Sequence, residues 1–503
     1  MPNTLYDALI APHKANSKTL LHLKDRPDWS YLDLIETAGR YATLLDSIGA
    51  KPGDRVAVQV NKSPEAIALY LACVQQSCVF LPLNTAYTPA EVEYFIGDAK
   101  PVLLVGDESA ETRLRSIANS HNCQMLTLNS DGGGSFDQQA KSLEPTTAAQ
   151  PAADDDLAAI LYTSGTTGRS KGAMLTHHNL LSNAVTLKDY WQFTDTDVLL
   201  HGLPIYHTHG LFVATNTILL AGGSCNFLSA YNSDDFIHYL PKSTTMMGVP
   251  TFYTRLLADD RLTNDLVSHM RLFISGSAPL LAETHEEFES RTGQRILERY
   301  GMTETNMSTS NPYDGERRAG TVGFELPGVE ARIVDPETGE LKTTDEIGVL
   351  EVRGANVFKG YWQMPEKTAQ EFKPDGFFIT GDLAKRDTDG YLHIVGRDKD
   401  LIISGGFNVY PKEIELILDD QPGVLESAVV AAPHPDFGEG VVAVLVAQTA
   451  QTIDLDSIKA AASETLAKFK QPKEYLLLDA LPRNTMGKVQ KNILRDQVKD
   501  TFG

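Results

Sequence analysis

A short loop between residues 161 and 172, with the sequence LYTSGTTGRSKG, has the composition of an anion-binding site. Its glycines allow a tight backbone turn that directs N–H groups at one point. Serine and threonine hydroxyls add neutral donors, and Arg169 and Lys171 add positive charge. The apolar run 157–161 predicts a strand that leads into the loop. The pattern therefore predicts a polyphosphate cradle, but not a Walker A loop, which needs adjacent Gly-Lys before Ser or Thr.

Three other patterns bear a superficial likeness to known sites. Residues 438–443 fit GxGxxA, but they lead into a strand-like run rather than a helix, so we expect no dinucleotide site. The segment HEEFE at His285 is one residue short of HExxH and predicts no zinc-protease site. Histidines 177, 178, 201, 207 and 209 lack a recurring ligand spacing, so we expect no metal cluster there.

The composition is that of a globular protein of several domains. The chain has 503 residues, of which 42% are hydrophobic and 22% are charged, so it can bury large cores and is not a disordered protein. Its formal net charge of -22 argues against binding to nucleic acid or to an anionic membrane. Four cysteines without zinc-like pairing suit a reducing compartment. With no signal-peptide core and no run of about 20 apolar residues, a cytoplasmic enzyme is expected.

The elements that must position the loop alternate between strands and helices. Residues 55–60 and 102–106 are expected to be strands, and residues 64–73 a helix that begins with proline. This alternation favours an α/β fold with a largely parallel sheet. Residues 130–156, which are rich in glycine, proline and aspartate, are interpreted as a surface excursion.

The last part of the chain follows different patterns. Between 319 and 396, short β-like runs separated by Gly- and Asp-rich turns predict an antiparallel or β-barrel-like subdomain. After Gly396 the pattern is mixed α+β, with a helix over 411–418 and strands over 428–432 and 441–447. We therefore expect a main boundary at about 396–399, which separates a large N-terminal domain from a smaller C-terminal one.

Five short segments, taken together and in this order, indicate the family to which the chain is similar. They are the loop 163–172, YGMTE at 300–304, TGD at 380–382, GRDKDLI at 396–402 and NTMGKV at 484–489. In these segments the chain resembles the adenylate-forming superfamily of acyl-CoA synthetases, adenylation domains and firefly luciferases. Within the superfamily it is similar to malonyl-CoA synthetases, which also accept methylmalonate. The resemblance covers nearly the whole chain.

The resemblance implies a ligase that uses ATP, Mg²⁺ and coenzyme A. A carboxylate would attack the ATP α-phosphate to give acyl-AMP and pyrophosphate, and the CoA thiol would then displace AMP. Glu304, with Thr163, is implied to hold magnesium, for which hard oxygen ligands are suited. The residues implied to bind ATP are Thr163, Ser164, Gly165, Thr166, Thr167, Gly168, Lys171, Tyr300, Gly301, Met302, Thr303, Asp382 and Arg397.

The resemblance also implies that the C-terminal domain moves. Residues 1–396 would form the AMP-binding domain, residues 397–399 a hinge centred on Lys399, and residues 400–503 a small mobile domain that carries Lys488. A mobile ammonium at Lys488 can bridge the substrate carboxylate and the α-phosphate. Gly405 and Gly406 would allow close approach of the pantetheine arm of CoA.

A dicarboxylate substrate needs a cation for the carboxylate that is not activated. Arg255, in the apolar stretch that follows residues 252–254, is predicted to provide it from inside the acyl pocket, because a fork-shaped guanidinium suits a carboxylate. The resemblance adds the neighbouring substrate-binding residues His207, Ser277, Ala278 and Met307.

Several alternatives stay open on the sequence alone. The acid could be a short, medium-chain or aryl monocarboxylate, and the thiol could belong to a carrier protein rather than to free CoA. A luciferase-like oxygenase and a non-catalytic nucleotide-binding protein are further alternatives, although Lys488 and Glu304 argue against the latter. Small molecules are the expected partners, and a lysine acetyltransferase that acts on Lys488 is a further hypothesis.

Overall fold

The computed structural model describes residues 2–163, 170–404, 407–448, 453–466, 468–484 and 487–502. The predicted site residues Ser164, Gly165, Thr166, Thr167, Gly168, Gly405 and Gly406 lie outside the described residues. Internal contacts divide the chain into two compact units, which are considered separately below. The first unit is Met1–Glu330 with Val352–Phe378, and the second is Ala331–Glu351 with Ile379–Gly503.

One of the two sheets of the first unit contains the predicted phosphate loop. Its strand order is β18-β8-β7-β4-β3-β5-β6, in which β7, β4, β3, β5 and β6 are parallel to one another and β8 is antiparallel to β7 and β18. The strands are β3 (Arg55–Gln59), β4 (Val79–Pro82), β5 (Leu103–Gly106), β6 (Gln124–Thr127), β7 (Leu157–Thr163), β8 (Lys171–Thr176) and β18 (Gly360–Tyr361).

The other sheet of the first unit has the order β15-β14-β13-β12-β11-β9-β10-β1-β2. Its central strands are parallel, and β13 turns back into β14 as an antiparallel hairpin. The strands are β1 (Thr19–His22), β2 (Trp29–Ser30), β9 (Val198–His201), β10 (Ser224–Phe227), β11 (Thr245–Gly248), β12 (Leu272–Ser275), β13 (Ile296–Met302), β14 (Asn306–Ser310) and β15 (Phe324–Glu325).

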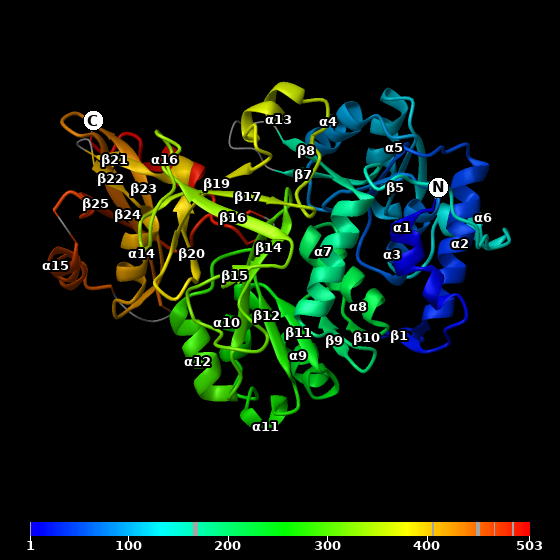
Figure 1. Ribbon diagram of the computed structural model, residues 1–503, viewed down its shortest axis with the longest axis horizontal. Helices are drawn as coiled ribbons and strands as arrows, with labels where there is room; N and C mark the ends of the chain where they lie inside the picture. The colour runs from blue at the N-terminus through cyan, green and yellow to red at the C-terminus, as the bar shows by residue number, and fades with distance from the viewer. Residues whose placement is uncertain are drawn as a thin grey trace. The chain divides into compact units, whose positions relative to one another are not determined.

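Helices cover both sheets of the first unit, and α7 lies between them (Figure 1). Thr176 caps α7 by accepting from the backbone N–H of Asn179, whose side chain also donates to the carbonyls of residues 355 and 357. The helices are α1 (Thr4–Leu9), α2 (Tyr31–Ser47), α3 (Pro64–Gln75), α4 (Pro89–Ala99), α5 (Glu111–Ser120), α6 (Ser135–Lys141), α7 (His177–Tyr190), α8 (Asn216–Ala221), α9 (Ser233–Tyr239), α10 (Pro250–Leu257), α11 (Asn264–Val267), α12 (Ala282–Thr292) and α13 (Pro365–Glu371).

The second unit contains a four-stranded sheet of order β16-β17-β19-β20. Its strands are β16 (Val329–Val334), β17 (Gly348–Gly354), β19 (Phe378–Arg386) and β20 (Leu392–Arg397). The β-rich subdomain predicted for 319–396 is therefore present, and its sheet is open, with β16 and β20 at its edges. Val349 and Leu383 of this sheet pack with Leu401 and Tyr410 in one apolar cluster.

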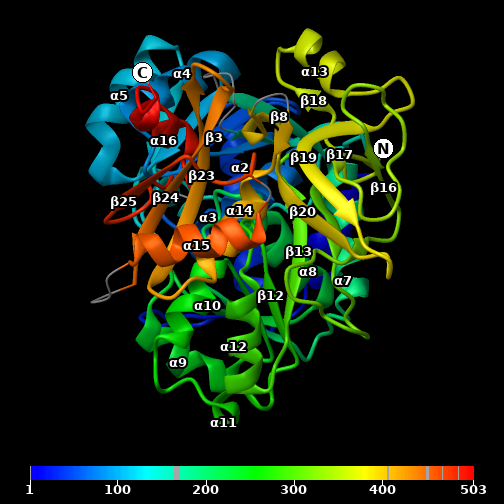
Figure 2. The same ribbon diagram turned by 90° about the vertical axis from the view of Figure 1, so that its left-hand side faces the viewer.

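The rest of the second unit is a five-stranded sheet with helices on both faces. Its strands are β21 (Ile402–Ser404), β22 (Phe407–Val409), β23 (Val424–His434), β24 (Gly438–Ala447) and β25 (Glu474–Leu478). Helices α14 (Pro411–Asp419) and α15 (Leu455–Thr465) pack on one face, and α16 (Lys491–Val498) packs on the other, as Figure 2 shows. Successive residues of β24 pack alternately into the apolar cores on the two faces of this sheet, which explains the continuous apolar run of the strand.

The predicted elements can be compared directly with these bounds. The strands expected at 55–60, 102–106, 428–432 and 441–447 are β3, β5, β23 and β24, and the helix expected at 64–73 is α3. The predicted mixed α/β class is confirmed. The interpretation of 130–156 as a plain surface excursion omitted α6, a helix of seven residues whose Phe136 is fully buried.

The division by contacts differs from the boundary predicted at 396–399. Residues 331–351 and 379–396 cluster with the C-terminal segment, because Val334, Val349 and Leu383 share a core with Leu401 and Tyr410. The hinge at 397–399 stays a prediction. Among the described residues, no helix is both long enough and apolar enough to cross a bilayer.

Candidate active site

The predicted phosphate loop connects two antiparallel strands at the edge of the seven-stranded sheet. Thr163 ends β7 and Lys171 begins β8, and the two residues are paired in register. The Thr163 hydroxyl donates to the Lys171 carbonyl at 3.4 Å. Tyr94 on α4 donates its hydroxyl to the carbonyl of Ser170 at 2.8 Å, which fixes the C-terminal end of the loop. The sheet therefore holds both ends of the loop, and residues 164–169 lie outside the described part of the chain.

Lys171 belongs to a compact network that reaches Glu304. Its Nζ lies 3.2 Å from Oε1 of Glu371 and 4.0 Å from the centroid of the Tyr361 ring. The Tyr361 hydroxyl lies 2.7 Å from Oε2 of Glu371 and 3.0 Å from Oε1 of Glu304. The pairing of β18 with β8 explains this geometry, because it sets Tyr361 opposite Ala173. The structure thus brings together two residues that were predicted separately, Lys171 and Glu304.

Glu304 lies in the tight turn between β13 and β14. Tyr300, Gly301 and Met302 end β13, and Thr303 and Glu304 are buried in the turn itself. Gly301 is required there, because a Cβ atom at this position would lie 1.8 Å from the carbonyl oxygen of Asn306. The predicted adenine and magnesium segment is therefore a rigid hairpin end.

The protein groups around Glu304 fit a magnesium ion that arrives with its nucleotide. No group of three or more His, Cys, Asp or Glu side chains able to hold a metal occurs among the described residues. Magnesium commonly takes one or two protein carboxylates, and substrate phosphates and water complete its shell. A single buried carboxylate at Glu304 beside a phosphate loop suits that arrangement.

The predicted acyl-binding residues come from three neighbouring segments of the first unit. Ser277 and Ala278 lie in the loop after β12, His207 precedes the π-helix η3 (His209–Thr215), and Met307 is buried in β14. Ser277 has a φ of +72°, a strained conformation for a serine. Its hydroxyl lies 3.1 Å from Nδ1 of His209.

A candidate site residue that the sequence analysis did not single out is Arg299. It lies on β13, its residue surface is 2% exposed, and its Nε and Nη2 have no hydrogen-bond partner among the described residues. A Cβ atom at Gly276 would lie 2.4 Å from its Nη1, so the guanidinium rests against the backbone next to Ser277. Burial lowers the pKa of Arg299 to about 9, which leaves it charged at pH 7.

A buried cation is costly unless nearby groups offset it, and the charge of Glu298 raises the pKa of Arg299 in part against burial. His209 is buried beside Arg299, and its Nε2 also has no partner in the described part of the chain. Burial, with the nearby charge of Arg299, holds the pKa of His209 well below its ordinary value. A neutral imidazole and a charged guanidinium, each with a polar atom that has no hydrogen-bond partner among the described residues, therefore lie beside Ser277.

The structure shows Arg255 exposed rather than buried, and its predicted role in the acyl pocket stays a prediction. Helix α10 turns Phe252, Tyr253, Leu256 and Leu257 inward, so residues 254 and 255 face outward and Arg255 is exposed. Its guanidinium lies over the ring of Tyr231, 5.5 Å from the centroid. A buried cation on the same unit is Arg299.

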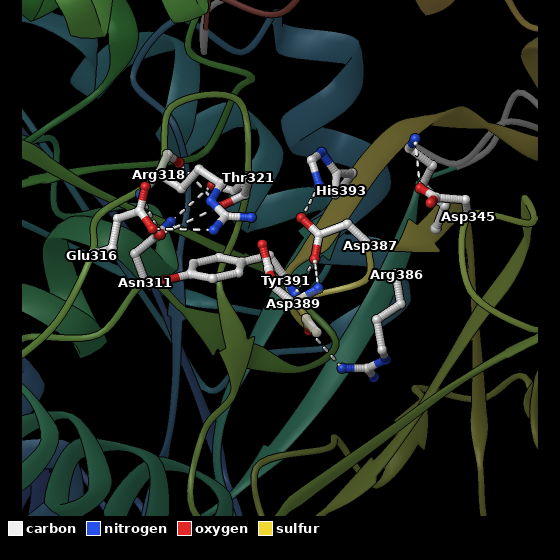
Figure 3. A network of polar contacts seen from close by, with 12 residues as sticks. Asn311, Glu316, Arg318, Thr321, Asp345, Arg386, Asp387, Asp389, Tyr391 and His393 are labelled. Atoms are coloured by element: carbon white, nitrogen blue, oxygen red, sulfur yellow. Dashed lines mark hydrogen bonds and ion pairs between the residues drawn. The ribbon is translucent and has the colours of Figure 1, made fainter.

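In the second unit, the predicted ribose-binding residues face each other across one hairpin. Asp382 on β19 pairs in register with Arg397 on β20, and Nε of Arg397 lies 2.6 Å from Oδ1 of Asp382. The other end of this hairpin is held by Asp387, which accepts from the backbone N–H groups of Asp389 and Tyr391 and contacts His393 at 3.0 Å (Figure 3). The hairpin therefore presents a buried carboxylate and an arginine as a fixed pair.

The predicted catalytic lysine lies in an exposed turn of the second unit. The backbone N–H of Lys488 donates to the Asn484 side chain at 2.9 Å, and its carbonyl accepts from the Asn484 N–H at 2.9 Å. Gly487, with a φ of +75°, allows this turn. Lys399 is exposed in the 3₁₀ turn η5 (Asp398–Asp400), directly after Arg397.

The fold and these sites define the chain as a member of the AMP-binding enzyme family. The model of that family matches residues 11–362, and the model of the AMP-binding enzyme C-terminal domain matches residues 413–488. The chain therefore carries both parts of an adenylate-forming, AMP-producing acid–CoA ligase.

Individual relatives of the chain are named after different acid substrates. A malonate–CoA ligase of Arabidopsis thaliana is 33% identical over 92% of this chain and 81% of its own length. The solved structure of ATP-bound MatB from Rhodopseudomonas palustris is 55% identical, covers both chains completely and superposes with a TM-score of 0.98. A feruloyl-CoA synthase of an Amycolatopsis species is 34% identical over 94% of both chains, so family membership alone does not select the acid.

Proposed function

We propose that the protein ligates malonate, and also methylmalonate, to coenzyme A through an acyl-AMP intermediate, with release of pyrophosphate and AMP. The observation that carries this proposal is the buried guanidinium of Arg299 beside Ser277 and His209, whose Nε and Nη2 have no hydrogen-bond partner among the described residues. A monocarboxylate would leave this cation unpaired, at a cost of roughly 1–3 kcal/mol or more. The second carboxylate of malonate would fill it.

Each unit contains residues proposed to bind the nucleotide. In the first unit, the loop from Thr163 to Lys171 would receive the β- and γ-phosphates. Glu304 and Thr163 would hold Mg²⁺, and the chemistry this ion supplies when bound is neutralisation of phosphate charge. In the second unit, Asp382 would accept from the ribose hydroxyls, with Arg397 holding its carboxylate in place. The first half-reaction depends on alignment and charge neutralisation more than on covalent help.

Lys488, in the second unit, is proposed to act in the adenylation step. An exposed ammonium on a turn closed by Asn484 can be presented to two anions at once, the substrate carboxylate and the α-phosphate. Gly405 and Gly406, outside the described residues, are proposed to line the CoA tunnel. Acetylation of Lys488 by a lysine acetyltransferase would abolish its charge and stop this step. All four cysteines are buried free thiols, which supports a cytoplasmic location.

A hinge at 397–399 would allow the second half-reaction. Lys399→Pro is expected to preserve acyl-AMP formation and to lower thioester formation about a hundredfold, because proline fixes φ near -65° in a turn that must change conformation. Pyrophosphate release without CoA and acyl-CoA formation with CoA are measured separately. Equal loss of both half-reactions would indicate misfolding or a different pivot.

An acid panel tests the proposed function directly. The purified protein is incubated with ATP, CoA and each acid in turn, and AMP and acyl-CoA are both quantified. Malonate and methylmalonate should exceed acetate, butyrate, octanoate and ferulate in kcat/KM by about two orders of magnitude or more. A monocarboxylate that matches malonate would refute the dicarboxylate assignment and leave only the ligase class.

A further inference from the structure

We propose that Glu371 is an internal counter-ion that competes with the nucleotide's phosphates for Lys171 and thereby weakens the binding of ATP and pyrophosphate. The inference rests on the proposed function, because it assigns Lys171 to the phosphates. It identifies Glu371 as a positioning residue, which acts through Lys171 rather than by touching the reacting atoms.

The first step of the argument is the position of the two charges. The side chains of Lys171 and Glu371 are 13% and 19% exposed, so their pair at 3.2 Å is only partly screened by water. A lysine already paired with a carboxylate offers little net charge to an incoming phosphate. Binding a polyphosphate at the end of β8 therefore requires Lys171 to exchange one anion for another.

The second step is that Glu371 has an ion-pair partner and a hydrogen-bond donor besides Lys171. Lys367, one turn earlier on α13, lies 2.8 Å from Oε1 of Glu371, and the Tyr361 hydroxyl lies 2.7 Å from Oε2. Burial alone would raise the pKa of Glu371, but its contacts with Lys367, Tyr361 and Lys171 outweigh burial and lower it. The carboxylate can thus release Lys171 and remain charged and hydrogen-bonded.

The third step concerns Lys171 once it is released. Its ammonium lies 4.0 Å from the centroid of the Tyr361 ring, a cation–π contact that does not depend on Glu371. The ring therefore keeps the ammonium at the end of β8 when the carboxylate is lost. The geometry predicts that removing the charge of Glu371 strengthens phosphate binding, whereas loss of an ordinary structural ion pair would weaken it.

The last step links this exchange to Glu304. The Tyr361 hydroxyl has one proton and faces two carboxylates, Glu371 at 2.7 Å and Glu304 at 3.0 Å. It can donate to only one of them at a time. When Glu304 binds the incoming nucleotide complex, the Tyr361 hydroxyl donates to Glu371 instead. Glu371 then has a second hydrogen-bond donor, and its ion pair with Lys171 breaks more easily. Tyr361 couples the two ends of the site in this way.

Titration calorimetry with inorganic pyrophosphate and magnesium on the full-length protein tests the proposal without turnover. Glu371→Gln should bind pyrophosphate about tenfold tighter than the wild type, and the KM for ATP should fall in parallel. Glu371→Asp, whose shorter carboxylate reaches Lys171 less well, should show a smaller gain. Glu366→Gln, an exposed carboxylate on the same helix, is the matched control and should change nothing.

A double-mutant cycle distinguishes competition between Glu371 and the phosphates for Lys171 from general repulsion between Glu371 and the phosphates. In a Lys171→Met background, Glu371→Gln should no longer affect pyrophosphate binding, because Glu371 has no ammonium at position 171 to pair with. A gain that persists without Lys171, or Glu371 variants that bind pyrophosphate no tighter than the wild type, would overturn the proposal. A wild-type protein that binds neither pyrophosphate nor ATP would instead refute the proposed function itself.

Discussion

Lys488→Ala is expected to lower the rate of acyl-AMP formation about a thousandfold, because one charge aimed at the developing transition state commonly contributes that much. The lysine would neutralise charge on the attacking carboxylate and the α-phosphate together. Pyrophosphate release in the presence of ATP and malonate, without CoA, measures this step. Thioester formation from supplied malonyl-AMP should stay within a few-fold of the wild type, because Lys488 is not used in it.

The matched control is Lys499→Ala, an exposed lysine near the end of the same unit. It should leave both half-reactions unchanged. If Lys488→Ala releases pyrophosphate within a few-fold of the wild-type rate, the catalytic assignment is wrong. If both half-reactions fall together, the substitution has disturbed the fold rather than removed a charge, and unfolding temperatures of the two variants will show it.

Some segments of the candidate site could be predicted from the sequence because their residues are close together in the chain. The loop 163–172 lies between two strands, and its glycines, hydroxyls and cations are consecutive. Gly301 and Glu304 lie in one hairpin end, and Asp382 and Arg397 are paired across another. Composition alone marked the loop 163–172, whereas Glu304, Asp382 and Arg397 were implied by the family resemblance of the short segments that contain them.

Contacts between distant segments could not be predicted in the same way. Glu371 is 200 residues from Lys171, and only the addition of β18 beside β8 brings Tyr361 and α13 to the phosphate loop. Nothing in the composition of 360–371 marks a contact with the loop. The open order of the four-stranded sheet likewise depends on pairing, which short β-like runs do not specify.

The two arginines show where the sequence reasoning was incomplete. The spacing of Phe252, Tyr253, Leu256 and Leu257 is itself helical, so it already turns position 255 to the solvent side. Arg299 lies in ILERYGM, where an arginine among apolar residues in a parallel strand was a signal of a buried charge. A charged residue in a buried strand is a stronger signal of a buried charge than one on an amphipathic helix.

Arg299→Met is therefore expected to lower kcat/KM for malonate about a thousandfold. Methionine approximates the length of the arginine stem and preserves packing against Gly276, but it removes the donors that the second carboxylate needs. Butyrate, which has a methyl group in place of that carboxylate, should be used as well as by the wild type or better. The ratio of the two specificity constants is the quantity to measure, at saturating ATP and CoA.

Arg255→Met is the informative comparison, because Arg255 is exposed and Arg299 is buried on the same unit. It should change the malonate-to-butyrate ratio by less than about tenfold, as expected for an exposed cation. Binding of pyrophosphate should be unchanged in both variants, which excludes global unfolding as the cause of any loss. If Arg299→Met keeps its preference for malonate, or loses both acids equally, the buried guanidinium does not select the dicarboxylate. If the ratio falls only in Arg255→Met, the selecting cation is the exposed one on α10.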